Sequence, residues 1–196
     1  MEARNAAADG EQIERLIARL GDRCIVLVGM MGAGKTSIGK RLANALRLPF
    51  LDADAEIEKA ANLSIAEIFQ NYGEAHFREG ERRVVARLMA SGPAVLATGG
   101  GAFISDETRE SARRHGVTIW LRADPSVLLE RVRKKGNRPL LNDPDPEGVL
   151  RRLLIEREPF YSRADIVIAS REGPHQSVVA EIVAALEAHL GRGAGS

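Results

Sequence analysis

The feature that most constrains this chain is a glycine-rich loop that begins directly after a short apolar run. Cys24–Val28 contains only apolar residues, and residues 29–36 read Gly-Met-Met-Gly-Ala-Gly-Lys-Thr. This is the pattern G-x-x-x-x-G-K-[ST], placed between an expected buried strand and a helix expected over 35–46. Glycines let successive backbone N–H groups point at phosphate oxygens, and the helix N-terminus adds a positive dipole end. The sequence therefore predicts a nucleotide-binding α/β fold.

Each residue of this loop has an expected task. We expect Lys35 to reach the β- and γ-phosphates and the Thr36 hydroxyl to ligate Mg²⁺. The other ATP-binding residues expected in the loop and the following helix are Gly32, Ala33, Gly34 and Ser37. The alternatives are a glycine turn with a solvated lysine, or a nucleotide site that no longer turns over.

Short apolar runs alternate with helical patterns along the rest of the chain, which favours a parallel α/β layer fold. Strands are expected over 24–28, 50–51, 93–98, 117–121 and 166–169. Further helices are expected from a capping box at 64–67, and over 74–89, 124–134, 147–158 and 176–190. We expect an N-terminal extension over 1–22, partly helical around 13–20, one domain over 23–190 and a flexible tail over 191–196.

Composition excludes several classes of protein. The 196 residues carry 28 basic and 27 acidic side chains, a formal net charge of +1. This balance argues against nucleic-acid and membrane-surface binding, which depend on a basic surplus. Cys24 is the only cysteine, so an intramolecular disulfide or a Cys-based zinc site is excluded. With no signal peptide or spanning segment, a cytoplasmic setting is the expectation.

Two aspartates follow the second expected strand at its carboxyl end, where open α/β sheets bind ligands. Asp52 and Asp54 stand two residues apart, so in an extended segment both side chains face the same side. We expect Asp52 to lie near Mg²⁺ through water, and Asp54 to accept a hydrogen bond or a proton from a substrate hydroxyl. The structural alternative makes Asp54 a helix N-cap and Asp52 a turn residue.

The motifs of other nucleotide-binding classes are missing. The chain has neither the Asn-Lys-x-Asp motif of GTPases nor the Leu-Ser-Gly-Gly-Gln signature of ATP-binding-cassette proteins. Arginine is unusually frequent, with 23 arginines against 5 lysines. This excess reflects either a bias of composition or arginines that hold phosphate and carboxylate groups in a planar fork.

Six sequence blocks in order resemble the shikimate kinase family. They are the loop at 29–36, Phe-Leu-Asp-Ala-Asp at 50–54, Phe77-Arg78-x-x-Glu81, Gly99-Gly100-Gly101, Arg138-Pro139-Leu140-Leu141 and Glu156-Arg157-x-x-x-Tyr161. The resemblance spans roughly residues 23–190. It implies a three-layer αβα fold with a five-stranded parallel sheet in the order 2-3-1-4-5. It also implies transfer of the ATP γ-phosphoryl group to the 3-hydroxyl of shikimate, in aromatic amino-acid biosynthesis, by a monomer.

The resemblance also implies roles for individual residues. Asp54 holds the reacting hydroxyls, and Arg78 and Arg157 clamp the substrate carboxylate. Gly99, Gly100 and Gly101 form the glycine turn that approaches the substrate. On the nucleotide side, Arg138 closes over the transferring phosphoryl group, Arg131 stacks on adenine, and Ser170–Pro174 forms the adenine-side loop. The residues expected to line the pocket, or alternatively to pack in the core, are Ile65, Phe69, Phe77, Pro139 and Leu140.

The segment around 135–147, rich in Pro, Asn and Asp, is expected to be a mobile lid that excludes water, or else a plain surface loop. Two other functions compete with a shikimate kinase. One is another small-molecule kinase, either a gluconate-type carbohydrate kinase or a nucleotide kinase. The other is a nucleotide-binding regulator or scaffold that does not catalyse.

Overall fold

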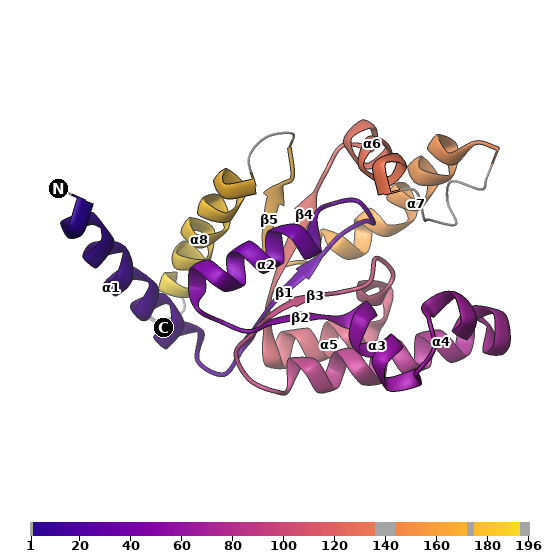
Figure 1. Cartoon of the computed structure of the whole chain (residues 1–196), viewed down its shortest axis with the longest axis horizontal. Coiled ribbons are helices and arrows are strands. Elements are labelled where there is room, and N and C mark those ends of the chain that lie inside the picture. Colours follow the sequence, from indigo (N-terminus) through magenta and orange to yellow (C-terminus); the bar gives the residue numbers. More distant parts are fainter. Residues whose placement is uncertain (1, 136–143, 172–174, 193–196) are drawn as a thin grey trace.

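A parallel sheet of five strands forms the centre of the molecule (Figure 1). The computed structural model describes residues 2–135, 144–171 and 175–192. The strands are β1 (Cys24–Val28), β2 (Phe50–Asp52), β3 (Val95–Ala97), β4 (Gly116–Arg122) and β5 (Ile166–Ala169). Their order is β2-β3-β1-β4-β5, and every neighbouring pair is parallel, which confirms the expected order.

Strand β1 lies in the middle of this sheet, and its sequence explains why. All five of its side chains are fully buried, as a strand covered by helices on both faces requires. Leu27 pairs with Ala97 on one side and with Ile119 on the other. The glycine-rich loop therefore leaves the sheet at its centre, at the carboxyl ends of the neighbouring strands.

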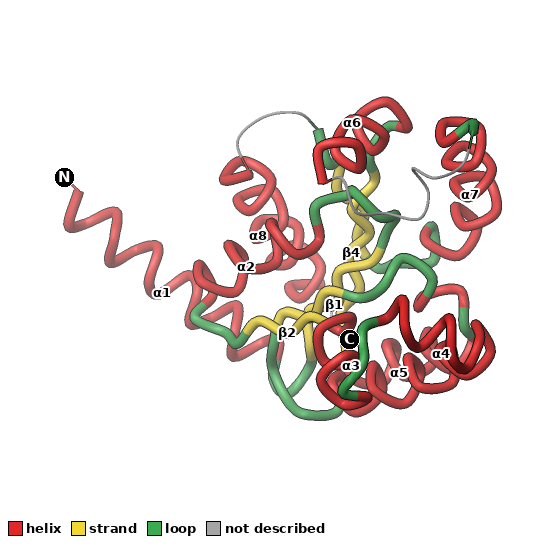
Figure 2. The backbone as a smooth tube through the Cα atoms, turned by 45° about the vertical axis from the view of Figure 1, so that its right-hand side comes forward, coloured by secondary structure: helices red, strands yellow, loops and turns green. Residues whose placement is uncertain are grey.

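Helices cover both faces of the sheet (Figures 1 and 2). On one face lie α2 (Lys35–Leu46) and α8 (His175–Arg192), and on the other lie α4 (Ile65–Met89) and α5 (Asp106–His115). The remaining elements are α1 (Glu2–Leu20), α3 (Ala53–Ala61), the 3₁₀ helix η1 (Ala102–Ile104), α6 (Pro125–Lys135) and α7 (Pro146–Tyr161). Among the described helices, none is long and apolar enough to cross a lipid bilayer.

Helix α1 projects from the body, but its C-terminal end belongs to the core (Figure 1). Leu16 and Leu20 are buried in the main apolar cluster. Gln12 Nε2 donates a hydrogen bond to Glu187 Oε2 of α8 at 2.7 Å. The helical pattern expected around 13–20 is confirmed, and the helix begins earlier, at Glu2.

Two helices were not expected from the sequence. Helix α3 follows β2 without a loop, and Asp52 caps it by accepting a hydrogen bond from the Asp54 backbone. Helix α5 has no apolar periodicity, because Ala112 is its only apolar residue. Its start is encoded by Ser105, whose side chain accepts from the Thr108 backbone.

Helix α4 carries both a confirmed start signal and a break. The Ser64 side chain accepts from the Glu67 backbone and the Glu67 side chain accepts from the Ser64 backbone, which completes the expected capping box. Gly73 has φ 80° and ψ 172°, which interrupts the helix. The two helices expected at 64–67 and 74–89 therefore meet at Gly73.

Candidate active site

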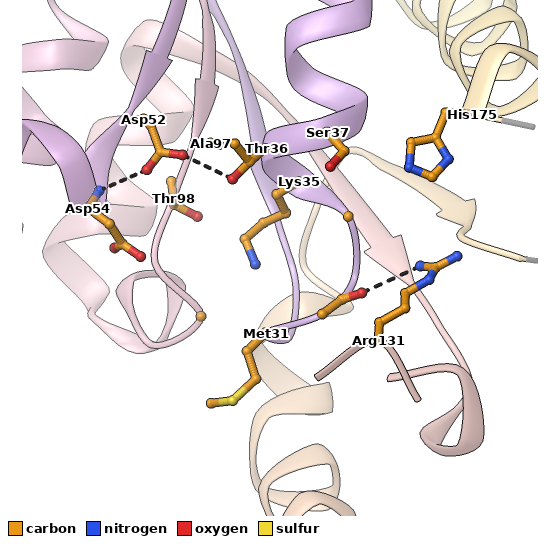
Figure 3. A pocket seen from close by; sticks show the side chains of 13 residues that line it. Met31, Lys35, Thr36, Ser37, Asp52, Asp54, Ala97, Thr98, Arg131 and His175 are labelled. Carbon is orange, nitrogen blue, oxygen red and sulfur yellow. Dashed lines mark hydrogen bonds between the residues drawn. The ribbon is translucent and has the colours of Figure 1, made fainter. Parts of the chain in front are cut away.

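The glycine-rich loop curls around the side chain of its own lysine (Figure 3). Lys35 Nζ donates to the carbonyl oxygens of Gly29 at 2.7 Å and Met30 at 2.9 Å. Gly29 has φ +132°, and a Cβ there would lie 2.7 Å from the Leu121 carbonyl oxygen of β4. Only glycine permits this backbone to pass so close to the neighbouring strand. The ammonium group therefore stays inside the curve of the loop, where phosphate oxygens would bind.

A hydroxyl and a carboxylate meet beside this loop. The Thr36 hydroxyl donates to Asp52 Oδ2 at 3.0 Å, and the other Asp52 oxygen accepts from the Asp54 backbone N–H at 3.1 Å (Figure 3). Asp52 thus links the start of α2 to the start of α3. These are hard oxygen donors of the kind that Mg²⁺ prefers. Within the described residues, no group of three or more His, Cys, Asp or Glu side chains could hold a metal ion.

The geometry of the two aspartates differs from the sequence expectation. We expected both in one extended segment, but β2 ends at Asp52 and α3 begins at Ala53. The helix N-cap is Asp52, and Asp54 lies in the first turn of α3. Both side chains still line one cavity, because the strand-to-helix turn stands at the carboxyl end of the sheet.

Arg131 of α6 joins the phosphate loop to the end of β5. Its guanidinium donates to Ser170 Oγ at 2.9 Å, to the Arg171 carbonyl at 2.8 Å and to the Gly32 carbonyl at 3.4 Å. The buried Ser170 hydroxyl donates in turn to the Ala33 carbonyl at 2.8 Å. This network fixes one wall of the cavity beside the loop. His175 at the start of α8 stands on the same wall (Figure 3).

On the opposite side, Arg78 of α4 is held by two carboxylates. Its Nη1 donates to Glu81 Oε2 at 2.7 Å, and its Nε and Nη2 both donate to Glu74 Oε1 at 3.2 Å. Glu81 is almost completely buried, with 2% of its surface exposed. Burial raises the pKa of Glu81, and the hydrogen bond from Arg78 offsets only part of this rise. The nearby negative charge of Asp54 adds to it.

The glycine turn at 99–101 lies close against these charged groups. A Cβ on Gly99 would lie 2.5 Å from Glu81 Oε1 and 3.0 Å from Asp54 Oδ1. A Cβ on Gly101 would lie 2.5 Å from Arg78 Nη1. The absence of side chains at 99 and 101 therefore lets an acid and an arginine approach the backbone from both sides.

The carbonyl of Gly100 is the point at which α7 reaches this turn. Arg157 Nη1 donates to it at 3.4 Å and lies 3.9 Å from the Met30 sulfur. The buried Tyr161 hydroxyl also donates to this carbonyl. Arg157 and Tyr161 therefore connect the glycine turn to α7. Arg157 also contacts the phosphate loop, because Met30 is part of that loop.

Two cavities collect most of the expected site residues. One, of about 280 Å³, is lined by Gly32, Gly34, Lys35, Thr36, Ser37, Asp52, Asp54, Gly100 and Arg131, together with Met31, Ala97, Thr98 and His175. The other, of about 330 Å³, is bordered by Arg78, Gly101 and Arg157. Adjacent residues of the glycine turn, Gly100 and Gly101, face the two cavities. Residues 136–143 of the lid expected around 135–147, which include Arg138, Pro139 and Leu140, and residues 172–174 lie outside the described residues. The ends of the expected lid belong to α6, which ends at Lys135, and to α7, which begins at Pro146.

The apolar residues expected along the pocket have a different place. Phe77 and Ile68 are buried with Ile57 in a small cluster between α3 and α4, and Ile65 packs against it. The Phe69 and Phe77 rings stack at 4.6 Å between centroids. In the described part of the chain, Phe77 is buried in this cluster and Ile65 packs against it, as the core alternative expects, whereas Phe69 is 36% exposed. None of these three residues lines either of the two cavities.

Several residues of the site have no role predicted from the sequence. Met31, Thr98 and His175 line the first cavity, and Glu81 lies behind the glycine turn. Glu81 had a signal, since it stands three residues after Arg78 on one helix face. His175 had none, because α8 meets the loop only through the tertiary structure.

The fold and this site define a class. A phosphate loop after the central strand, with an aspartate across the cavity and arginines beyond it, is the arrangement of a P-loop phosphotransferase for small molecules. The family model described as shikimate kinase matches residues 31–187. This chain therefore belongs to the shikimate kinase family, and it is a small-molecule kinase.

Relatives and solved structures agree with this family. A protein of Bradyrhizobium diazoefficiens named shikimate kinase is 57% identical over 175 residues, which cover 89% of this chain and 84% of the relative. A protein of Rhodopseudomonas palustris with the same name is 54% identical over 185 residues, which cover 94% of this chain and 91% of the relative. The structure of shikimate kinase from Acinetobacter baumannii in complex with shikimate superposes with TM-score 0.80 at 38% identity, covering 87% and 94%. A gluconokinase from Sinorhizobium meliloti, at 23% identity and TM-score 0.55, is similar in fold.

Proposed function

We propose that this chain transfers the γ-phosphoryl group of ATP to the 3-hydroxyl of shikimate, which yields shikimate 3-phosphate and ADP. The observation that carries the proposal is a single cavity bordered by Lys35, Thr36 and Asp54. Lys35 belongs to a phosphate loop, while Asp54 is a hydroxyl acceptor on another element. Donor and acceptor groups of a phosphoryl transfer thus face one space.

On the nucleotide side, the backbone N–H groups of the loop and the N-terminus of α2 bind the phosphates. Lys35 leaves the Gly29 and Met30 carbonyls and follows the β- and γ-phosphate oxygens, as its flexible side chain permits. Arg131 and the adenine-side loop at 170–174 border the nucleotide base. Arg138 closes with the lid over the transferring group, and this closure excludes water.

The oxygen pair of Thr36 and Asp52 fits Mg²⁺. Thr36, through its hydroxyl, and Asp52, through a water molecule, would hold the ion. When bound, Mg²⁺ would neutralise part of the negative charge that develops on the phosphates during transfer. Asp52 also caps α3, so the same carboxylate holds Asp54 in its place.

On the acceptor side, Asp54 holds and orients the 3-hydroxyl by accepting its hydrogen bond. The hydroxyl oxygen then attacks the γ-phosphorus, the bond to the β–γ bridging oxygen breaks, and ADP leaves. The hydroxyl proton passes to the Asp54 carboxylate and from there to solvent. Arg78 and Arg157 bind the substrate carboxylate, which fixes the ring against Gly99–Gly101. To bind the substrate carboxylate, Arg157 gives up its 3.4 Å hydrogen bond to the Gly100 carbonyl. The Tyr161 hydroxyl still donates a hydrogen bond to that carbonyl.

The test is an acceptor-specificity assay. ADP release is coupled to an optical readout with ATP, Mg²⁺ and, in separate reactions, shikimate, gluconate and nucleoside monophosphates. We expect turnover with shikimate and only background rates with the others. Absence of shikimate-dependent turnover would overturn the proposal, and turnover with gluconate instead would favour a carbohydrate kinase. Sedimentation of the same sample tests the proposed monomer, and fractionation of the source cells tests the proposed cytoplasmic location.

A further inference from the structure

The cavity of about 330 Å³ between α4, the turn at 101–105 and α7 has three guanidinium groups on its walls. Arg78 and Arg157 are the pair assigned to the substrate carboxylate, and the third is Arg82. Arg82 stands four residues after Arg78, so both side chains leave the same face of α4. Nothing in the sequence motifs marks this arginine.

Arg82 differs from the other arginines of α4 in its partners. Arg78 is paired with Glu74 and Glu81, Arg83 with Glu79 at 3.7 Å, and Arg87 with Glu56 at 3.7 Å. Among the residues that the structure describes, Arg82 has no hydrogen bond or ion pair. Like charges four residues apart repel on a helix, so Arg82 beside Arg78 gives α4 no stability of its own.

The charge of this cavity is unbalanced. Its walls hold three arginines against the carboxylates of Glu74 and Glu81, and both carboxylates are used by Arg78. The charge of Arg82 also acts on Glu107, which is fully exposed. The pKa of Glu107 is lowered mainly by its hydrogen bond from Ser105, with a smaller contribution from the charge of Arg82. The half-buried Arg82 side chain therefore lines the cavity with a positive charge that Glu107 offsets only slightly.

We propose that Arg82 is a specificity-determining residue that draws the anionic carboxylate of the acceptor into the cavity where Arg78 and Arg157 bind it. This inference rests on the proposed function and adds to it a third cation that touches no reacting atom. Arg82 selects acceptors by their negative charge. It acts on acceptor binding, because a charge remote from the transferring group stabilises the ground state and the transition state equally.

The test compares Arg82→Gln with Arg83→Gln, a change of the same kind at the neighbouring, ion-paired position. We expect Arg82→Gln to raise the KM for shikimate about threefold to fivefold, which is the effect of losing the attraction between one partly screened charge and the carboxylate. Its kcat and KM for ATP stay within twofold of the original chain, as do all constants of Arg83→Gln. Arg82→Lys restores the KM, since charge rather than fork geometry acts. Added salt weakens the difference between Arg82→Gln and the original chain.

An uncharged acceptor analogue separates attraction from a structural effect. The methyl ester of shikimate, used as an inhibitor competitive with shikimate, should have the same Ki for Arg82→Gln and the original chain. An ester Ki that rises as much as the shikimate KM would overturn the proposal, as would identical KM values for the two glutamine variants. If the original chain shows no turnover with shikimate, the proposed function fails instead.

Discussion

Asp54 and Glu81 are two carboxylates that both approach Gly99 on the side where a Cβ would point, and their surroundings differ. Glu81 is buried and accepts from Arg78, so it holds an arginine in place. Asp54 faces the cavity that the phosphate loop also borders. The proposed distinction between a supporting and a reacting acid rests on what each side chain contacts, because the two carboxyl groups have the same chemistry.

The first prediction concerns Asp54. Replacement Asp54→Asn keeps the shape of the side chain but removes the charge that accepts the substrate hydroxyl. We expect kcat to fall by about 10²–10⁴-fold, the range of acid–base contributions. ATP affinity, measured by calorimetry, should stay nearly unchanged. Asp22→Asn, at an exposed position outside the cavity, is the control, and an Asp54→Asn variant as active as this control would refute the assigned role.

A second prediction concerns the pH dependence of stability. Burial raises the pKa of Glu81 above the ordinary 4.5. At pH values between 4.5 and the raised pKa, the folded chain keeps a proton on Glu81 that the unfolded chain has lost. The resulting stability is fully present below the ordinary pKa and is lost as pH rises through the folded value. Glu81→Gln should remove this decline in thermal unfolding curves recorded from pH 4.5 to neutral pH.

The control for Glu81 is Glu107→Gln. The pKa of Glu107 is lowered, chiefly by the hydrogen bond from Ser105, so its stabilisation is present at higher pH and lost as pH falls. The two variants should therefore change the pH profile in opposite senses, Glu81→Gln above pH 4.5 and Glu107→Gln below it, so the unfolding curves of Glu107→Gln are extended to pH values below 4.5. If stability declines with rising pH in Glu81→Gln as it does in the original chain, a group other than Glu81 causes the decline.

At the scale of elements, the site is built where strands turn into helices. The phosphate loop joins β1 to α2, Asp52 joins β2 to α3, and the glycine turn joins β3 to η1. In a parallel sheet these junctions all lie at the same edge, so residues far apart in the chain face one space. Helix α7 then closes the acceptor side through Arg157 and Tyr161.

A third prediction tests how closely α4 approaches the glycine turn. Gly101→Ala would place a Cβ 2.5 Å from Arg78 Nη1 and displace this guanidinium. We expect the KM for shikimate to rise about tenfold, the equivalent of one lost charge-assisted hydrogen bond. Gly80→Ala on α4 is the control, because its Cβ meets nothing within 4 Å. Equal KM values for the two variants would show that Arg78 adjusts without loss.

At the scale of the whole molecule, the N-terminal helix α1 contributes to the core without approaching the site. Leu16 and Leu20 are buried in the main apolar cluster, and α1 packs along α8 (Figures 1 and 2). Helix α8 also presents His175 to the first cavity, at the opposite end from α1. A change in α1 should therefore affect stability far more than catalysis.

The fourth prediction is made for this interface. Leu16→Ala leaves a cavity between α1 and the body and should lower the free energy of unfolding by about 2–5 kcal/mol. Denaturant titration measures this loss, while kcat and both KM values are expected to stay within twofold at low temperature. Arg15→Ala, at an exposed neighbouring position, should change stability by less than about 0.5 kcal/mol. Loss of activity in Leu16→Ala under folded conditions would connect α1 to the site.

The residues whose role is local could be predicted from the sequence. The phosphate loop, the Ser64 capping box and the buried strand β1 each depend on neighbours within a few positions, so their patterns can be recognised in the sequence alone. Helix α5 was missed because it is polar apart from Ala112, and α3 because it follows a three-residue strand without a loop. The extended geometry expected for Asp52 and Asp54 failed because a cap hydrogen bond bends the chain there.

The sequence by itself determined the chemistry available to this protein: a loop that binds phosphates, acids after a strand, arginines with planar forks, and the six blocks of the family. Only the tertiary structure decided which of these groups meet. It buried Glu81 behind Gly99, brought His175 and Arg131 to one wall, and left Arg82 beside Arg78 and Arg157. The reason is physical, since backbone hydrogen bonds and burial are local, whereas cavities form where elements distant in the chain pack together.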